Sequence, residues 1–334
     1  MRLRKTIPLI ALLALAACGT SAESRTATVP APVSADKLAK VTLKVGDQKG
    51  GSKALLTAAG LLDDLPYKIE WATFTSGPPL LEAVSAGGVD VGRVGNTPPI
   101  FAAAANAKIA IVSSSHGNVE SDAILVPKDS QLKTVADLKG KTIGVAKGSS
   151  AHGQVLYNLR KAGLSTKDVK LSFLQPADAY GAFNQHQIDA WAVWDPYTSQ
   201  AKLESGARVL ADGRGTANGY TFIVGGTQAL SDPGTNSAIR DYVLRHAKAE
   251  RWADTHHEEW AQAWAKETGL SIEVSRLVVK AGPDLPVPLD DKVVTSEQEL
   301  ADAFTADGVL PGKVDFAKFV DRRYASDINK GQNS

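Results

Sequence analysis

Five short segments of the sequence end in small or polar residues that can donate hydrogen bonds. Each segment follows a β-type run and precedes a helical pattern. In open α/β sheets, ligands bind beyond the carboxyl ends of the strands, at the N-termini of the helices that follow. We therefore predict that these residues surround one ligand-binding cleft. They are Gln48, Ser76 with Gly77, Asn96 with Thr97, Ser149 with Ser150, and Trp194 with Asp195.

Several of these residues also have a purely structural interpretation. Ser149 or Ser150 could be a helix N-cap, and Gln48 could cap its own turn rather than face a ligand. Trp191 and Trp194 are three positions apart, so strand alternation places them on opposite faces. One of the two then belongs to the core, and Trp194, at the strand end, is expected to cover the apolar part of a ligand.

Three further positions leave two interpretations open. His116 follows a predicted strand end and His152 a predicted helix start, so either could donate to an anion or could be a surface group. Asp195 precedes Pro196, a pattern typical of an N-cap followed by proline in the first helical turn. Selection of an amine on the ligand is the alternative role for Asp195.

Motifs of several enzyme classes are incomplete. Gly140-Lys141-Thr142 resembles the end of a phosphate-binding loop, but Val135 stands where that loop needs glycine, and a strand follows. The run from His256 to Glu259 lacks the spacing of a zinc protease, and no Gly-x-Ser-x-Gly elbow occurs. The single cysteine offers no cysteine metal site. We expect no enzymatic activity, no metal and no cofactor.

The elements that must position the cleft residues alternate between strands and helices from Val41 onward, which predicts an α/β protein. About 290 residues exceed one compact core, so two lobes are expected. Lobe one comprises residues 41–122 and 220–330, including C-terminal helices, and lobe two comprises residues 123–219. Each lobe is predicted to be an open, mainly parallel sheet flanked by helices. Two crossovers, near Asp122 and Tyr220, would form a hinge.

The N-terminal residues predict an exported lipoprotein. Three basic residues precede an uncharged apolar run over residues 7–17, which is too short to span a bilayer. The run ends in Leu15-Ala16-Ala17-Cys18, which resembles the lipobox of bacterial lipoproteins. Residues 1–18 are thus interpreted as a signal peptide with Cys18 as the lipidation site, and residues 19–40 as a flexible tether. We expect location at the outer face of the cell membrane, or in the periplasm, with attachment through the lipid alone.

The charge balance argues against a polyanionic partner. The chain has 37 basic and 36 acidic residues. Without the three basic residues of the signal, the count is 34 against 36, or a net charge of about −2. We therefore expect no nucleic-acid binding.

Six segments, in order and at compatible spacings, resemble the periplasmic aliphatic-sulfonate-binding proteins of ABC importers. Nitrate, taurine and thiamine-precursor binders are more distant relatives. The resemblance covers nearly the whole mature chain and implies the type II periplasmic binding protein fold. The segments are Asp47-Gln48-Lys49, SGPPLLEAVSAGGVDVG, VGNTPPIFAAAA, DAILVPKDSQLKTVADLKGKTIGVAKGSSAH, LQPADAYGAF and IDAWAVWDPY.

This resemblance implies a monomeric receptor that delivers an alkyl sulfonate to an ABC permease and ATPase. A sulfonate is fully ionised and has three acceptor oxygens, so helix starts can replace its water without adding a buried charge. Pro79, Asn96 and Asp47 depart from the family, which usually has Gln, Asp and Tyr there. The ligand could therefore be taurine, nitrate, another organosulfur anion or a thiamine pyrimidine precursor. A pyrimidine synthase on the same fold and a structural lipoprotein are more remote alternatives.

Overall fold

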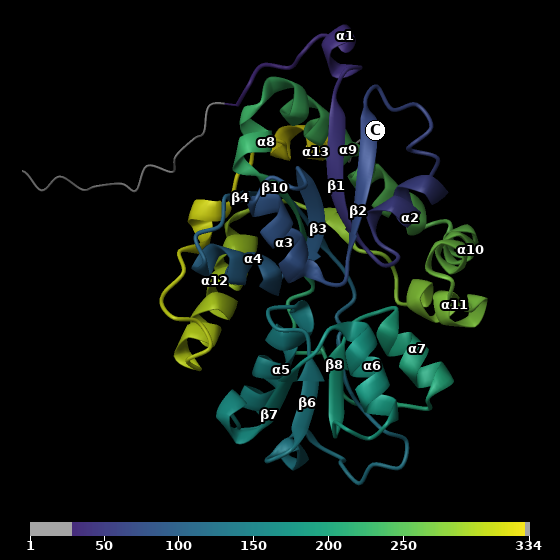
Figure 1. Cartoon of the computed structure of the whole chain (residues 1–334), viewed down its shortest axis with the longest axis vertical. Helices are drawn as coiled ribbons and strands as arrows, with labels where there is room; N and C mark the ends of the chain where they lie inside the picture. The colour runs from purple at the N-terminus through teal and green to yellow at the C-terminus, as the bar shows by residue number, and fades with distance from the viewer. Residues whose placement is uncertain (1–28, 331–334) are drawn as a thin grey trace, which may run out of the picture.

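The computed structural model describes residues 29–330, which form two β-sheets flanked by helices (Figure 1). Cys18 and the predicted signal peptide lie outside these residues. The first sheet has the order β11-β4-β10-β3-β1-β2 and the second has the order β7-β6-β8-β5-β9. No helix within residues 29–330 is long and apolar enough to cross a membrane.

The strands of the first sheet come from both ends of the described chain. They are β1 (Thr42–Gln48), β2 (Lys68–Phe74), β3 (Val91–Gly95), β4 (Ile109–His116), β10 (Tyr220–Gly226) and β11 (Leu285–Val287). The second sheet is built from one continuous stretch. Its strands are β5 (Ala123–Val126), β6 (Thr142–Val145), β7 (Lys170–Phe173), β8 (Ala190–Val193) and β9 (Arg208–Asp212).

Helices cover both faces of each sheet. Around the first sheet these are α1 (Ala35–Leu38), α2 (Ser52–Ala58), α3 (Gly77–Ser85), α4 (Thr97–Ala104), α8 (Thr227–Ser231), α9 (Pro233–Ala253), α10 (His257–Thr268), α11 (Ile272–Lys280), α12 (Asp291–Ala306) and α13 (Ala325–Lys330). Around the second sheet they are α5 (Ser150–Lys161), α6 (Pro176–Asn184) and α7 (Tyr197–Glu204). Short 3₁₀ turns occupy Val135–Leu138, Thr166–Asp168 and Phe316–Phe319.

Each sheet buries a hydrophobic cluster on either face. On the first sheet, Leu43 and Val45 pack with Ile239 of α9 on one face, and α3, α4 and α12 supply the cluster on the other. The second sheet is covered by α5 on one face and by α6 on the other, where Trp191 is buried. Burial of these apolar side chains is the main favourable contribution to folding.

The predicted α/β, two-lobed fold is confirmed, but the sheets are mixed rather than mainly parallel. β1 is parallel to β2 and β3, whereas β10 is antiparallel to β3 and β4. β6 is parallel to β7 and β8, whereas β5 is antiparallel to β8 and β9. The reason is that β5 and β10 begin at the connections between the sheets, where the parallel strands end.

Two connections join the sheets, one between β4 and β5 and the other between β9 and β10. In Figure 1 both pass through the narrow middle of the molecule. The predicted lobe limits at residues 122 and 220 fall at these connections, and the division itself stays a prediction. The consequence for the site is that the carboxyl ends of β1 and β3 face those of β6 and β8.

Candidate functional site

A cavity of about 260 Å³ lies between the two sheets and is lined from both sides. The connection after β1 contributes Gln48, and the starts of α3 and α4 contribute Gly77 and Asn96. The structure thus brings seven of the eleven predicted ligand-facing residues to one cavity. From the second sheet these include Ser149, Ser150, Trp194 and Asp195.

Four predicted residues do not line this cavity. Ser76 is fully buried, and its hydroxyl donates to Oε1 of Gln175 on the opposite side at 2.9 Å. Thr97 is also fully buried, and its hydroxyl donates to Oδ1 of Asn96 at 2.9 Å. These two hydroxyl groups therefore support the cavity wall rather than facing a ligand.

The two histidine predictions have separate explanations. His116 is exposed at the end of β4, where its ring contacts the ring of Tyr220 edge-on. His152 is fully buried, and its Nδ1 accepts the Gly148 N–H at 3.1 Å. Burial lowers the pKa of His152 to about 4, so this ring is neutral at pH 7.

His152 belongs to an aromatic contact between the two sides of the molecule. Its ring lies 5.7 Å from Phe101 of α4 and 5.2 Å from Phe304 of α12, centroid to centroid. The third residue of the first turn of α5 thus points at the opposite lobe and not into the cavity. The position of His152 on α5 and the packing of that helix against Phe101 and Phe304 together set this direction.

The start of α5 combines a cap with a group that faces the cavity. Ser149 is the N-cap, since its hydroxyl accepts from the His152 N–H at 3.4 Å and donates to the Ala146 carbonyl at 2.8 Å. Gly148 precedes it with φ of +76°, a conformation that favours glycine. Ser150 donates to Oδ1 of Asp122 at 3.3 Å. The capping interpretation of Ser149 is confirmed. The Ser150 hydroxyl is the one that could leave Asp122 and donate to a ligand instead.

Asp122, which the sequence reading did not select, lies in the cavity wall beside Ser150. Burial raises its pKa to about 7, and the negative charges of Asp284 and Asp195 act in the same direction. Close to neutral pH this carboxyl group therefore changes between its neutral and its ionised form. In its neutral form it can donate a hydrogen bond, and in its ionised form it repels an anion.

Trp194 and Asp195 come from the end of β8. Trp191 is 1% exposed and belongs to the core, whereas Trp194 lines the cavity, as strand alternation predicts. Oδ1 of Asp195 accepts the Ser199 N–H at 2.8 Å. Asp195 therefore caps α7, and Pro196 occupies the N-cap position rather than the first helical position.

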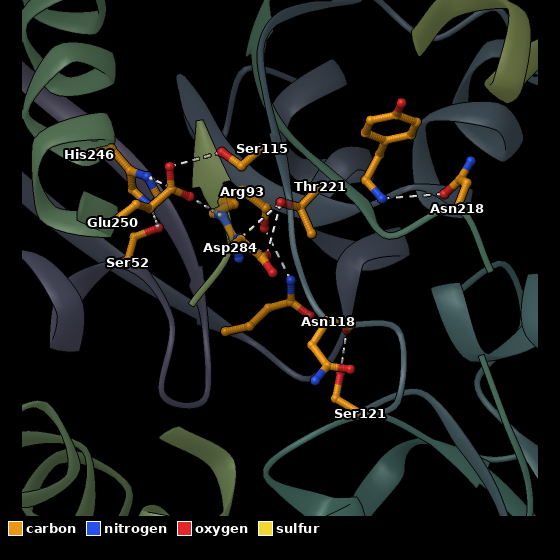
Figure 2. Close-up of polar contacts among 12 residues, drawn as sticks. Ser52, Arg93, Ser115, Asn118, Ser121, Asn218, Thr221, His246, Glu250 and Asp284 are labelled. Carbon is orange, nitrogen blue, oxygen red and sulfur yellow. Dashed lines mark hydrogen bonds and ion pairs between the residues drawn. The ribbon is translucent and has the colours of Figure 1, made fainter. Parts of the chain in front are cut away.

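Arg93 is a cavity residue that the sequence analysis missed. Its guanidinium donates to Oγ1 of Thr221 at 2.8 Å and forms a short ion pair with Asp284 (Figure 2). Its Nε lies 3.6 Å from Oε1 of Glu250. A charged residue inside the otherwise buried strand Val91–Gly95 was the signal that could have identified it.

Behind Arg93, a buried polar network connects β4, α2 and α9 (Figure 2). Ser115 donates to Oε2 of Glu250 at 2.9 Å, and Nδ1 of His246 lies 3.4 Å from Oε1 of the same carboxylate. Nε2 of His246 in turn contacts the Ser52 hydroxyl at 3.1 Å. Ser115 and His246 hold Glu250 in place, and Glu250 in turn helps to fix the position of Arg93.

The chemistry of the cavity is that of binding. Its donors include helix-start N–H groups, hydroxyls, amides, the Arg93 guanidinium and the Lys49 ammonium group, and within residues 29–330 no group of three or more His, Cys, Asp or Glu side chains could hold a metal. The first N–H groups of a helix have no intrahelical acceptor, so the start of α5 can donate several of them to an anion. At the start of α4, Pro98 and Pro99 have no N–H, so this helix offers the Thr97 N–H, the Asn96 side-chain amide and its dipole.

Comparison with known proteins gives consistent results over most of the chain. Residues 53–266 match the NMT1-like family. The chain is 36% identical to a protein of Escherichia coli (strain K12) named as an aliphatic sulfonates-binding protein, over 82% of this chain and 86% of the relative. A Bacillus subtilis (strain 168) protein of the same name is 30% identical, over 77% of each chain.

A solved structure extends this similarity to three dimensions. The alkanesulfonate-binding protein SsuA from Xanthomonas axonopodis pv. citri, bound to MOPS, is 36% identical to this chain. The two structures superpose with a TM-score of 0.78, over 84% of this chain and 98% of the other. The arrangement of two sheets around a cavity is thus shared with a structure in which a ligand is bound.

Proposed function

The chain belongs to the NMT1-like family, and we propose that it is the extracytoplasmic solute-binding component of an ABC importer for aliphatic sulfonates. This membership agrees with the resemblance seen in the six sequence segments. The relatives that cover most of the chain are binding proteins by name, one of them solved with MOPS, which is itself a sulfonate. The role assigned here is accordingly capture and delivery, not catalysis.

One observation carries this proposal: the starts of α4 and α5 meet in the cavity. A Cβ built on Gly95, just before α4, would lie 3.1 Å from Cβ of Ser150. Two helix N-termini, with the Asn96 amide and the Ser150 hydroxyl, thus converge on one small volume. Such a group of neutral donors suits a strong-acid head group, which gains hydrogen bonds without needing a buried counter-charge.

The rest of the ligand would lie along the apolar part of the same cavity. Trp194 lines it from the second sheet, and the stacked rings of Trp260 and Trp264, 5.3 Å apart, line it from α10. Burial of an alkyl tail there contributes about 0.8 kcal/mol per methylene group. Gln48, Gly77 and Asp195 complete the proposed ligand-facing set.

The proposed mechanism is closure of the two lobes about the paired connections. Ligand bound to one lobe gains contacts from the other, so the ligand shifts the population toward the closed form. Contacts across the interface already exist, including Thr75 and Ser76 with Gln175, and Lys49 over the ring of Tyr197 at 5.7 Å. The permease and ATPase would recognise the closed shape of the monomer.

Export is supported by the solved SsuA protein from Escherichia coli, which is named as periplasmic and is 36% identical over 83% of this chain. Lipid attachment is proposed from the sequence alone. The apolar run ending in Leu15-Ala16-Ala17-Cys18 supports lipidation at Cys18. Mass spectrometry of the membrane fraction tests this. A diacylated Cys18 at the mature N-terminus is expected, whereas an intact Met1 would exclude the anchor.

Calorimetry tests the proposed ligand class. Butanesulfonate is expected to bind with a Kd of about 1 µM, equivalent to about −8 kcal/mol. Butanoate has the same tail and a weaker-acid head group with two oxygens, so it serves as the matched control and is expected to bind at least about tenfold more weakly. Tighter binding of butanoate or nitrate than of butanesulfonate would contradict the proposal.

A further inference from the structure

We infer that Glu297, which lies outside the cavity, determines which end of the Asn96 amide faces the ligand, and that it does so through Asn218. This inference rests on the proposed function, because Asn96 is taken to donate to the anion. It adds a positioning residue that belongs to a different element from any residue of the cavity wall.

The three side chains form a continuous hydrogen-bonded chain across three parts of the fold. Asn218 Nδ2 donates to Oε1 of Glu297 on α12 at 2.7 Å. Asn96 Nδ2, at the start of α4, donates to Oδ1 of Asn218 at 2.7 Å. Asn218 itself lies in the connection between β9 and β10, away from the Arg93 network in Figure 2. Glu297 thus reaches the cavity through one intermediate residue.

The direction of this chain follows from the chemistry of its last member. Asn218 turns its NH₂ group toward α12, where it donates to Oε1 of Glu297 and to the Ser296 hydroxyl at 3.0 Å. The carbonyl oxygen of Asn218 then faces Asn96. If the Asn96 amide were rotated by half a turn, two carbonyl oxygens would face each other without a hydrogen bond.

As a result, the side-chain NH₂ group of Asn96 is held in one orientation as a hydrogen-bond donor. Asn96 uses one hydrogen of its NH₂ group on Asn218, and its carbonyl oxygen accepts from Thr97 at 2.9 Å. An amide NH₂ group has two hydrogens. The second one therefore remains for the cavity, which Asn96 lines although it is only 7% exposed.

The burial of Glu297 supports a positioning role. Glu297 is completely buried, and its Oε2 has no hydrogen-bond partner within the part of the chain that the structure describes. Burial raises its pKa to about 8, so at pH 7 the group is mostly the neutral acid. The proton then belongs on Oε2, because Oε1 accepts from Asn218. A buried carboxyl group that is only half satisfied costs stability. An apolar residue would avoid that cost but could not orient Asn218.

A double-mutant cycle tests whether Glu297 acts through Asn96. Glu297→Leu removes the acceptor, whereas Glu297→Gln keeps an oxygen at the same position and is the matched control. Calorimetry with butanesulfonate is expected to give about tenfold weaker binding for Glu297→Leu, and binding within about twofold of wild type for Glu297→Gln. In an Asn96→Ala background, Glu297→Leu is expected to change the affinity by less than about twofold.

Two results of this double-mutant cycle would contradict the inference. An equal loss from Glu297→Leu with and without the Asn96 side chain would show that Glu297 supports the fold in general, and would overturn the inference. No loss from Glu297→Leu in the wild-type background would do the same.

A ligand-free measurement keeps this inference separate from the proposed function. If the wild type does not bind butanesulfonate, the proposed function fails, and the side-chain NH₂ resonances of Asn96 then test the inference by NMR. Those resonances, assigned by their loss in Asn96→Ala, are expected to shift in Glu297→Leu and to stay in place in Glu297→Gln. Unchanged Asn96 resonances in Glu297→Leu would contradict it.

Discussion

A Cβ atom placed on Gly153 in α5 would lie 2.5 Å from Oγ1 of Thr97 in α4, closer than real Cβ contacts allow. The two helices that carry the proposed head-group donors are therefore held at a separation that only glycine permits. Thr97 cannot easily move away, because it is fully buried and its hydroxyl is bonded to Asn96.

Two glycine-to-alanine changes in helices are expected to have opposite effects on stability, because only Gly153 has such a contact. Gly181→Ala in α6 adds a methyl group with nothing within 4 Å, so a gain of up to about 1 kcal/mol in the free energy of unfolding is expected from helix propensity. Gly153→Ala is expected to lose stability instead, and to weaken butanesulfonate binding. Urea unfolding and calorimetry on both variants check this, and a stabilised Gly153→Ala with full affinity would show that the contact is unimportant.

Ser149 and Ser150 are expected to differ although they are neighbours. Ser149→Ala removes the N-cap of α5 and should lower the free energy of unfolding by about 1 kcal/mol. Ser150→Ala removes a hydroxyl that faces the cavity and should weaken sulfonate binding by about 1 kcal/mol, with little effect on stability. Thermal unfolding and calorimetry, applied to each variant, separate the two roles. Equal behaviour of the two variants would argue against the assignment.

Asp122 makes sulfonate affinity depend on pH. Its pKa is raised to about 7, so the group is neutral below that pH and becomes a carboxylate as the pH rises through it. A carboxylate beside Ser150 repels the anion, so affinity should fall between about pH 6 and pH 8. Asp122→Asn is neutral at every pH and is expected to flatten this profile. A wild-type affinity that is constant over this range would refute the role of Asp122.

Arg93 is expected to matter for stability because of its two acidic partners. Arg93→Met would leave Glu250, whose side chain is 3% exposed, and Asp284 without their cation. Breaking a fully buried ion pair in this way costs about 3 to 5 kcal/mol. A smaller loss is expected here, because the Arg93 and Asp284 side chains are 25% and 24% exposed. Adding Glu250→Gln and Asp284→Asn to Arg93→Met should restore part of the free energy of unfolding, as measured in urea. Failure of the triple variant to exceed Arg93→Met would contradict this account.

The sequence predicted the parts of the site that depend on local order along the chain. Ser150 and Trp194 follow β6 and β8, which are parallel neighbours in the second sheet, so their convergence at one edge could be expected. Asn96 follows β3 of the first sheet, and its approach to Ser150 was expected only because two lobes were predicted to face one cleft. The alternation that places Trp191 in the core and Trp194 in the cavity wall is equally local.

The remaining features depend on contacts between distant segments. Arg93, Glu250 and Asp284 come from β3, α9 and the residues before β11, and only the folded chain brings them together. The role of His152 was left open by the sequence, because its direction depends on how α5 packs against Phe101 and Phe304. Likewise, no local pattern indicates that Glu297 on α12 is joined to Asn96.

The most direct test of the whole account is a crystal structure of the protein grown with butanesulfonate. The sulfonate oxygens are expected within hydrogen-bond distance of the Ser150 hydroxyl and of Nδ2 of Asn96, with the butyl chain directed toward Trp194. A sulfonate bound outside the cavity, or a cavity that holds the butyl chain at the starts of α4 and α5, would contradict the account.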